Sequence, residues 1–423
     1  MKKEIKYAIP YGSLSFCLGL IFLFCSCSLE IPETINQEMA GLPEEVDFNY
    51  HIKPILSDRC FKCHGPDEKT RKAGLRLDVE TLAFAKLASG NSAFSKGSVY
   101  RSEAAHRIVS KDIDIQMPPP DSNLQLSDRE KAMFLKWIEQ GAKWKEHWSF
   151  TPAKKTKASP LSVKNNKQVI DQFISDKLFE NDLSFEEEAT KETLIRRLRF
   201  DLTGIPPSIS EIDAFLKDTI PGNYERLVER LMDSESFAER LSLDWLDLSR
   251  YADSHGLHAD GLRTMWPWRD WVIDAFKKNM PYDQFVTWQL AGDLLPNATK
   301  EQKLATAFNR NSPMTAEGGI IDEEWRLNYV FDRTETFSTA FLGLTVACAK
   351  CHDHKFDPIS QKDYYQLSAF FNNVRELGMT GDDGDFGPLL YLPTENQEVQ
   401  LEKLKTLISQ TQTKLDLSKK ELA

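Results

Sequence analysis

Residues 60–66 read "CFKCHGP", and a later stretch, "CAKCHDHKFDP" at residues 348–358, repeats the same C-x-x-C-H spacing. In a helix, side chains three and four positions apart lie on one face. Two sets of side chains are therefore expected to share a face: Cys60, Cys63 and His64 in the first motif, and Cys348, Cys351 and His352 in the second. Such a set could hold a zinc ion, form a redox dithiol or attach a haem.

Attachment of a c-type haem uses every residue of each motif. The two thiols form thioether bonds to the porphyrin vinyl groups, and the imidazole after the second cysteine reaches the iron as proximal ligand. We therefore expect two covalently attached haem c groups. The motifs themselves predict a cytochrome c-like helical domain around residue 60.

Zinc and redox chemistry account for the motifs less well. A structural zinc site needs four Cys or His ligands, and the first motif supplies three, with His51 and His106 the next histidines. The second motif could recruit His354, but neighbours along one short run cannot easily surround an ion. A thioredoxin-type dithiol follows a strand in an α/β pattern and does not require the histidine. A zinc-binding scaffold remains the weaker alternative.

Met117, in "QMPPP", is the expected second axial ligand of the first haem. The prolines after it would hold the loop extended and rigid. A thioether opposite an imidazole gives a six-coordinate iron with a raised potential, which suits electron transfer. Core packing is the alternative for a methionine and fits Met133 better, whereas His51 and His106 are expected to be exposed or locally bonded.

The second haem has no equally marked sixth ligand in the sequence. Four residues are candidates: Met265, Met314, His255 and His258. An iron with an open coordination position would be reactive, which keeps a haem-dependent oxidoreductase as an alternative function.

The N-terminus predicts export. Three lysines precede the apolar run "SLSFCLGLIFLFCSC" at residues 13–27, whose length suits a signal peptide. Ser26 and Cys27 resemble the end of a lipoprotein signal, so Cys27 is the expected lipidation site and membrane anchor. A plain cleaved signal and an uncleaved anchor are the alternatives. All three place the remaining chain outside the cytoplasm, in the periplasm or at the cell surface.

The net charge of −11 argues against a nucleic-acid partner, because phosphate binding needs concentrated Lys and Arg.

With 41% hydrophobic residues, the 423-residue chain is long enough for two or three buried cores. The expected segments are a lipoprotein-type signal at 1–27, a tether at 28–45, a cytochrome c-like domain at 46–147, a linker at 148–165, a helical domain with the second motif at 166–375, a loop region at 376–394 and a coiled-coil-like helix at 395–423.

The expected fold is mainly α. In "LSDREKAMFLKWIEQGAKW" at residues 126–144, Ser127 and Glu130 are spaced as a capping box and Gly141 marks the end of a helix. Gly204 should end another helix, and Ser236 with Glu239 should open a third. The leucine spacing of residues 395–423 predicts one arm of a coiled coil, so another chain or a missing C-terminal module is expected as its partner.

Several longer stretches carry a family resemblance: residues 50–78, "MPPP" at 117–120, and residues 126–142, 250–297 and 341–371. They resemble the planctomycete-type multidomain cytochromes c, over most of residues 46–375. The resemblance implies haem attachment at both motifs, His64 and Met117 as an axial pair, and a further C-terminal module. The second module of that family has no defined role, and such proteins are often associated with polysaccharide breakdown. The leading hypothesis is an exported di-haem cytochrome that exchanges electrons with redox partner proteins.

Overall fold

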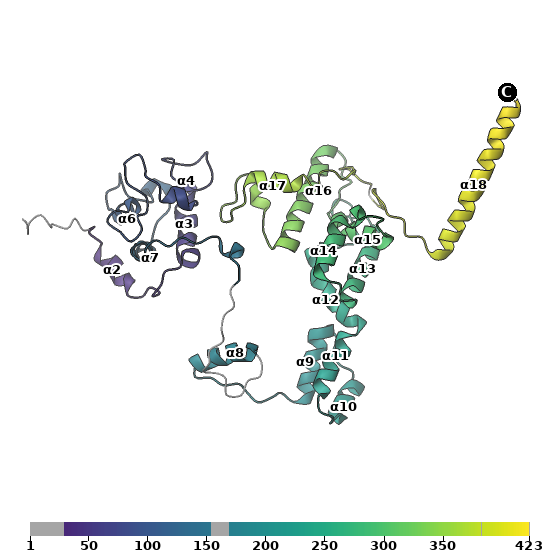
Figure 1. The fold of residues 1–423 in the computed structure, drawn as a ribbon, viewed down its shortest axis with the longest axis horizontal. Coiled ribbons are helices and arrows are strands. Elements are labelled where there is room, and N and C mark those ends of the chain that lie inside the picture. The colour runs from purple at the N-terminus through teal and green to yellow at the C-terminus, as the bar shows by residue number, and fades with distance from the viewer. Residues whose placement is uncertain (1–28, 154–168, 382, 423) are drawn as a thin grey trace, which may run out of the picture. The chain divides into compact units, whose positions relative to one another are not determined.

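The computed structural model describes three stretches of the chain: residues 29–153, 169–381 and 383–422. The expected signal peptide, Cys27 and most of the expected linker lie outside them. Helices dominate these stretches, and they contain no strand beyond isolated bridges (Figure 1). The predicted mainly α fold is therefore confirmed.

The chain divides into two compact units. The first contains residues 1–155 together with 348–362, and the second contains residues 156–347 and 363–423. Residues 348–362, which the sequence analysis assigned to the 166–375 domain, thus belong with the cytochrome c-like part of the chain.

The first unit is built from short helices around α7. In chain order they are α2 (Glu33–Met39), η2 (Phe48–Ile52), α3 (Lys53–Arg59), α4 (Phe61–His64), α5 (Glu80–Ala83), α6 (Glu103–Val109), η3 (Pro120–Ser122), α7 (Asp128–Glu139) and η4 (Trp148–Phe150). Helix α7 begins with the predicted capping box: the Ser127 hydroxyl accepts from the Glu130 amide at 3.2 Å, and the Glu130 carboxylate accepts from the Ser127 amide at 2.7 Å. Gly141 follows with a φ of +98°, a left-handed value that favours glycine.

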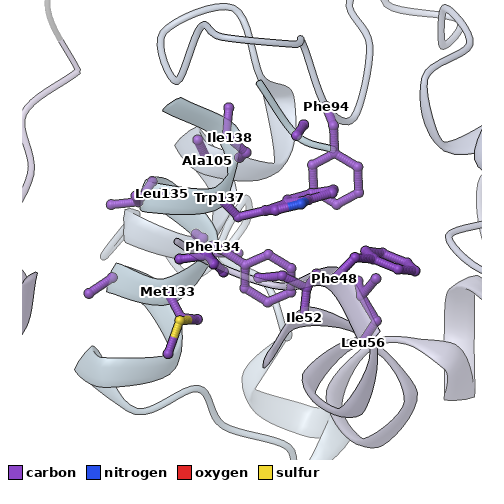
Figure 2. Packing of buried hydrophobic residues seen from close by; sticks show 14 of the residues in the cluster. Phe48, Ile52, Leu56, Phe94, Ala105, Met133, Phe134, Leu135, Trp137 and Ile138 are labelled. Carbon is purple, nitrogen blue, oxygen red and sulfur yellow. The ribbon is translucent and has the colours of Figure 1, made fainter. Parts of the chain in front are cut away.

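One hydrophobic core holds this unit together and fixes α3. Figure 2 shows the α7 side chains of Phe134 and Trp137 among those of Phe48, Ile52 and Leu56. Ile52 and Leu56 are fully buried, so the helix that leads into the first motif is firmly seated. Met133 lies in the same core, as expected.

The second unit has two smaller cores, one around Trp268 and one around Ile195. Its longer helices are α8 (Val169–Glu180), α9 (Lys191–Thr203), α10 (Ile209–Lys217), α11 (Asn223–Met232), α12 (Glu235–Leu248), α13 (Trp266–Lys277), α14 (Tyr282–Ala291), α15 (Lys300–Ala305), α16 (Asp322–Phe337), α17 (Gln361–Ser368, which starts in the 348–362 segment) and α18 (Glu395–Leu422).

Two predicted helix ends of this unit can be compared with the structure. Gly204, with a φ of +70°, ends α9 as predicted. The predicted box of Ser236 and Glu239 is wrong, because α12 begins at Glu235 and Ser234 accepts from the Phe237 amide at 3.3 Å. Helix α11 ends at Met232, so Ser234 is the first serine available to cap the next helix.

Helix α18 forms where the C-terminal arm was expected, and its side chains are exposed over residues 395–420. A coiled-coil partner for it stays a prediction. Within the described ranges, no helix combines the length and the apolar character needed to cross a membrane.

Candidate functional site

The first C-x-x-C-H motif adopts the helical geometry that its spacing predicts. Helix α3 ends at Arg59, and α4 begins at Phe61. Between them, the carbonyl of Cys60 accepts from the Cys63 amide at 3.1 Å and from the His64 amide at 2.8 Å. Both cysteines are free thiols. The chain therefore presents two thiols and an imidazole on one turn, the donor set that haem c attachment requires.

The segment after the motif is bonded back onto it. The Lys72 amide donates to the Cys63 carbonyl and the Leu77 amide to the His64 carbonyl, both at 2.8 Å. Gly65 allows the sharp exit from α4, because a Cβ there would lie 2.4 Å from the Phe61 carbonyl oxygen. These contacts fix the backbone at the end of the motif.

The electrostatics of this motif favour a protonated Cys60 and a neutral imidazole at His64. Burial raises the pKa of the Cys60 thiol to about 12, with the nearby Cys63 and Glu130 charges adding to the shift. A reactive redox dithiol instead needs a lowered thiol pKa. Burial also lowers the pKa of His64, and the charge of Arg107 acts in the same direction. Neutral imidazole is the form that binds a metal, and the His64 Nδ1 atom is buried without a partner.

Met117 lies half-buried in a loop that is tied to α6. Its amide donates to the Arg107 carbonyl at 3.0 Å, and Pro118 behind it is buried. The positive charge of Arg107, on the same helix, also contributes to the lowered pKa of His64. The two other histidines considered for the first motif have local hydrogen-bond partners. His51 Nδ1 accepts from the Asp47 amide at 2.8 Å, and His106 Nε2 lies 2.6 Å from the Tyr100 carbonyl.

The second motif is looser and more exposed. It starts in the short helix η9 (Ala347–Lys350), and the Cys348 carbonyl accepts from the Cys351 amide at 3.3 Å and from the His352 amide at 3.4 Å. The two cysteines and His352 are exposed. The residues needed to attach a haem are present, but the fold encloses them less than it encloses the first set.

Hydrogen bonds distinguish the two histidines of "CHDH". His352 Nδ1 lies 2.7 Å from the Asp353 carbonyl, which can only accept, so the bond assigns the proton to Nδ1 and leaves the Nε2 lone pair for iron. His354 Nδ1 accepts from the Asp357 amide at 2.9 Å. Neutral His354 therefore carries its proton on Nε2, which removes it as an iron ligand in this arrangement.

The four candidate sixth ligands of the second haem lie in the second unit, whereas the second motif belongs to the first. Met314 is buried, with its sulfur 3.9 Å from Arg310, and His255 Nε2 lies 3.0 Å from the Gly384 carbonyl. Met265 is buried as well, and His258 has a left-handed φ of +56°.

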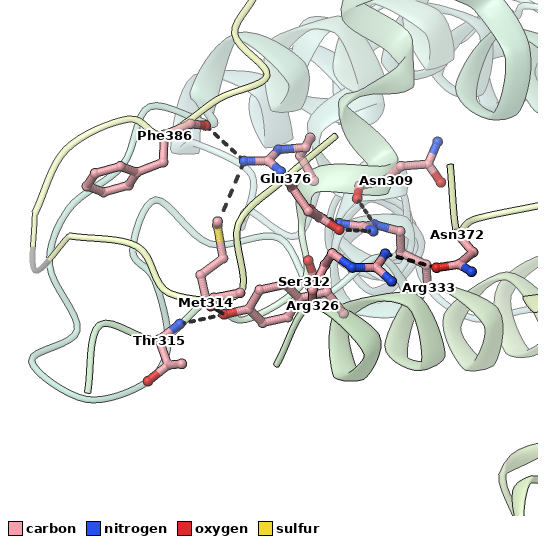
Figure 3. A network of polar contacts seen from close by, with 12 residues as sticks. Asn309, Ser312, Met314, Thr315, Arg326, Arg333, Asn372, Glu376 and Phe386 are labelled. Atoms are coloured by element: carbon pink, nitrogen blue, oxygen red, sulfur yellow. Dashed lines mark hydrogen bonds and ion pairs between the residues drawn. The ribbon is translucent and has the colours of Figure 1, made fainter. Parts of the chain in front are cut away.

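Met314 lies beside a buried ionic network that the sequence analysis missed. Figure 3 shows Glu376 beside the guanidinium group of Arg333. Arg310 donates to the same carboxylate, with Nη1 3.0 Å from Oε2. The Glu376 side chain is 1% exposed and that of Arg333 is 2% exposed. No local pattern marks this set, because its members are 43 and 66 positions apart.

A second missed group lies in the first unit. His147, just before η4, contacts Asp357 in the stretch "DHKFDP" that follows the second motif, with 3.0 Å between Nε2 and Oδ1.

Throughout the part of the chain that the structure describes, no group of three or more His, Cys, Asp or Glu side chains is arranged to hold one metal ion. Thiols that attach to two separate vinyl groups do not need to meet at one point.

Comparison with known families gives two matches. Residues 60–121 match the family described as "Planctomycete cytochrome C", and residues 169–376 match the family described as "Protein of unknown function (DUF1549)". The first match contains the first motif and Met117, and the second contains the second motif. No curated protein and no solved structure matches the chain.

Proposed function

The chain belongs to the planctomycete-type cytochrome c family, and from that premise we propose that it is an exported di-haem c-type cytochrome that transfers electrons. Family membership implies covalently bound haem c in the cytochrome domain. The number of haems and the role in electron transfer are the proposed part.

The residues of each motif would hold one haem. Cys60 and Cys63 would carry the thioether bonds of the first, with His64 and Met117 on either side of the iron. A bound haem c supplies an iron that alternates between the ferrous and ferric states. The chain's own contribution is to keep the imidazole neutral by burial and to hold the Met117 loop on α6, which favours a closed, low-spin site.

The observation that carries the proposal is the hydrogen bond of the imidazole in the second motif, His352. The Nδ1 bond of His352 to the Asp353 carbonyl leaves Nε2 free, as iron ligation requires, although this motif is far from the first in the sequence. Pyridine haemochrome analysis of the mature protein, made with haem-attachment machinery, should give about two haems per chain. One haem, or none, refutes the di-haem proposal, and zinc without iron would favour the scaffold instead.

Substituting Met117 with Ala should abolish the methionine-to-iron charge-transfer band of the oxidised protein while leaving the haem content unchanged. The reason is that a methyl group cannot replace the thioether at the iron. Met133→Leu is the matched control, because Met133 lies in the core and a volume-conserving change there is tolerated. Persistence of the band in Met117→Ala would show that another residue is the ligand.

The second motif supports a second candidate function, a haem-dependent oxidoreductase with an open second haem. Its proposed substrates are products of polysaccharide breakdown. The exposure of Cys348, Cys351 and His352 and the unsuitable tautomer of His354 favour it. We expect a high-spin ferric component that shifts on addition of cyanide, and that keeps shifting in Met117→Ala. Two fully low-spin haems in the unmodified protein would count against the enzyme.

The proposed location is the periplasm or the cell surface, with Cys27 as a lipid anchor and soluble or membrane-bound redox proteins as partners. The positively charged, apolar N-terminus supports it. Cells that express the protein should incorporate labelled fatty acid into it, and Cys27→Ser should abolish the label. A label that survives this substitution refutes the anchor.

A further inference from the structure

The second motif is followed by "DHKFDP", residues 353–358, which the proposed haem chemistry does not use. This segment lies in the first unit although it is separated from residue 155 by most of the second. Its own backbone is ordered by local bonds: the His354 amide donates to the Ile359 carbonyl, and the Ile359 amide to the Asp357 carbonyl, both at 2.8 Å. The segment is therefore a defined turn rather than an open loop.

Asp357 makes the closest contact of this segment with the rest of the unit. Its Oδ1 atom lies 3.0 Å from His147 Nε2. The side chains of His147 and Asp357 are only 10% and 20% exposed. His147 is oriented from its other side, where Nδ1 lies 2.7 Å from the Ser149 hydroxyl. Burial lowers the pKa of His147, so the contact is a hydrogen bond that the neutral imidazole donates from Nε2 to the Asp357 carboxylate. A hydrogen bond to a charged acceptor that is shielded from water orients both groups.

Helix α3 forms the other side of the contact. Lys355 Nζ lies 3.6 Å from Asp58 Oδ1. The charge of Asp357 also acts on Lys53 at the start of α3, where it opposes the lowering of the lysine pKa by burial. Helix α3 ends one residue before Cys60, so Lys355 contacts the helix that leads into the first motif.

We propose that residues 353–358 are a docking segment that holds the second C-x-x-C-H motif against α3 of the first module, through Asp357 and His147, so that the two haems form an interacting pair. The haem pair rests on the proposed di-haem function, whereas the docking does not. Asp357 and His147 are positioning residues in this proposal, since neither touches a haem thiol or an axial ligand.

The test compares the unmodified full-length holoprotein with Asp357→Lys, which places a like charge beside Lys53. Glu139→Lys is the matched control, because Glu139 is an exposed acid of the same unit, on α7. Hydrogen exchange of the backbone amides of residues 353–359 should become at least about tenfold faster in Asp357→Lys and stay unchanged in Glu139→Lys. Asp357→Asn serves as a milder second variant in case the lysine prevents folding.

Soret circular dichroism reports the haem pair independently. The unmodified protein should give a two-signed Soret signal from coupling between the haems, and Asp357→Lys should lose it while keeping its haem content. Unchanged exchange in both Asp357 variants overturns the docking. A single-signed Soret signal in a protein with two haems overturns the haem pair but leaves the di-haem function intact. One haem per chain refutes that function, and the exchange measurement still decides the docking.

Discussion

Replacing Cys60 and Cys63 together with serine is expected to lower the covalent haem content to about half that of the unmodified protein. A serine hydroxyl does not add to a porphyrin vinyl group under conditions in which a thiol does, so the first haem loses both of its bonds to the chain. Both thiols are free and stand on the turn that carries His64, so each is in place to bond to the haem. The measurement is haemochrome absorbance per chain, combined with the mass of the intact protein.

The matched variant replaces Cys348 and Cys351 with serine. It should lose the same amount of haem, but it should keep the methionine-to-iron band, because Met117 belongs to the first module. The first variant should lose that band together with its haem. If the Cys60 and Cys63 variant retains the haem content of the unmodified protein, covalent attachment at the first motif is refuted.

Local signals in the sequence were sufficient for much of the fold. The capping box of Ser127 and Glu130 and the stop at Gly204 each involve residues within one helical turn, and both are found where they were predicted. The error at α12 has the same origin. Ser234 and Ser236 are both good caps, and only the position at which α11 ends decides between them.

The contacts of the docking segment and the buried network could not be predicted in this way. His147 and Asp357 are far apart in the sequence, and each residue alone is typical of a solvated surface. The tautomer of His352 also depends on a single backbone carbonyl, whose direction follows from the turn after η9. Pairing of distant residues is a property of the tertiary structure, so a single sequence gives it no periodic signal.

Replacing Glu376 with Ala should destabilise the second unit by about 3–5 kcal/mol, because it leaves the buried guanidinium group of Arg333 and the partly buried one of Arg310 without their counter-charge. Arg333 and Arg310 both bond to this carboxylate, and Arg333 also donates to the Asn309 carbonyl, so neither can move easily into water. Burial already lowers the pKa of Arg310, and the Glu376 charge opposes that shift. Urea unfolding monitored by tryptophan fluorescence measures the loss.

Glu323→Ala is the control that separates burial from ion pairing as such. The Glu323 carboxylate also accepts two hydrogen bonds from one arginine, Arg326, at 2.7 Å each, but the Glu323 side chain is 63% exposed. Water and salt screen that pair, so its loss should shift the urea midpoint far less than the loss of Glu376. Equal midpoints for the two variants would mean that water reaches Glu376 and that the network does not stabilise the fold. A large shift for Glu376→Ala alone requires the dry, paired arrangement that the structure describes.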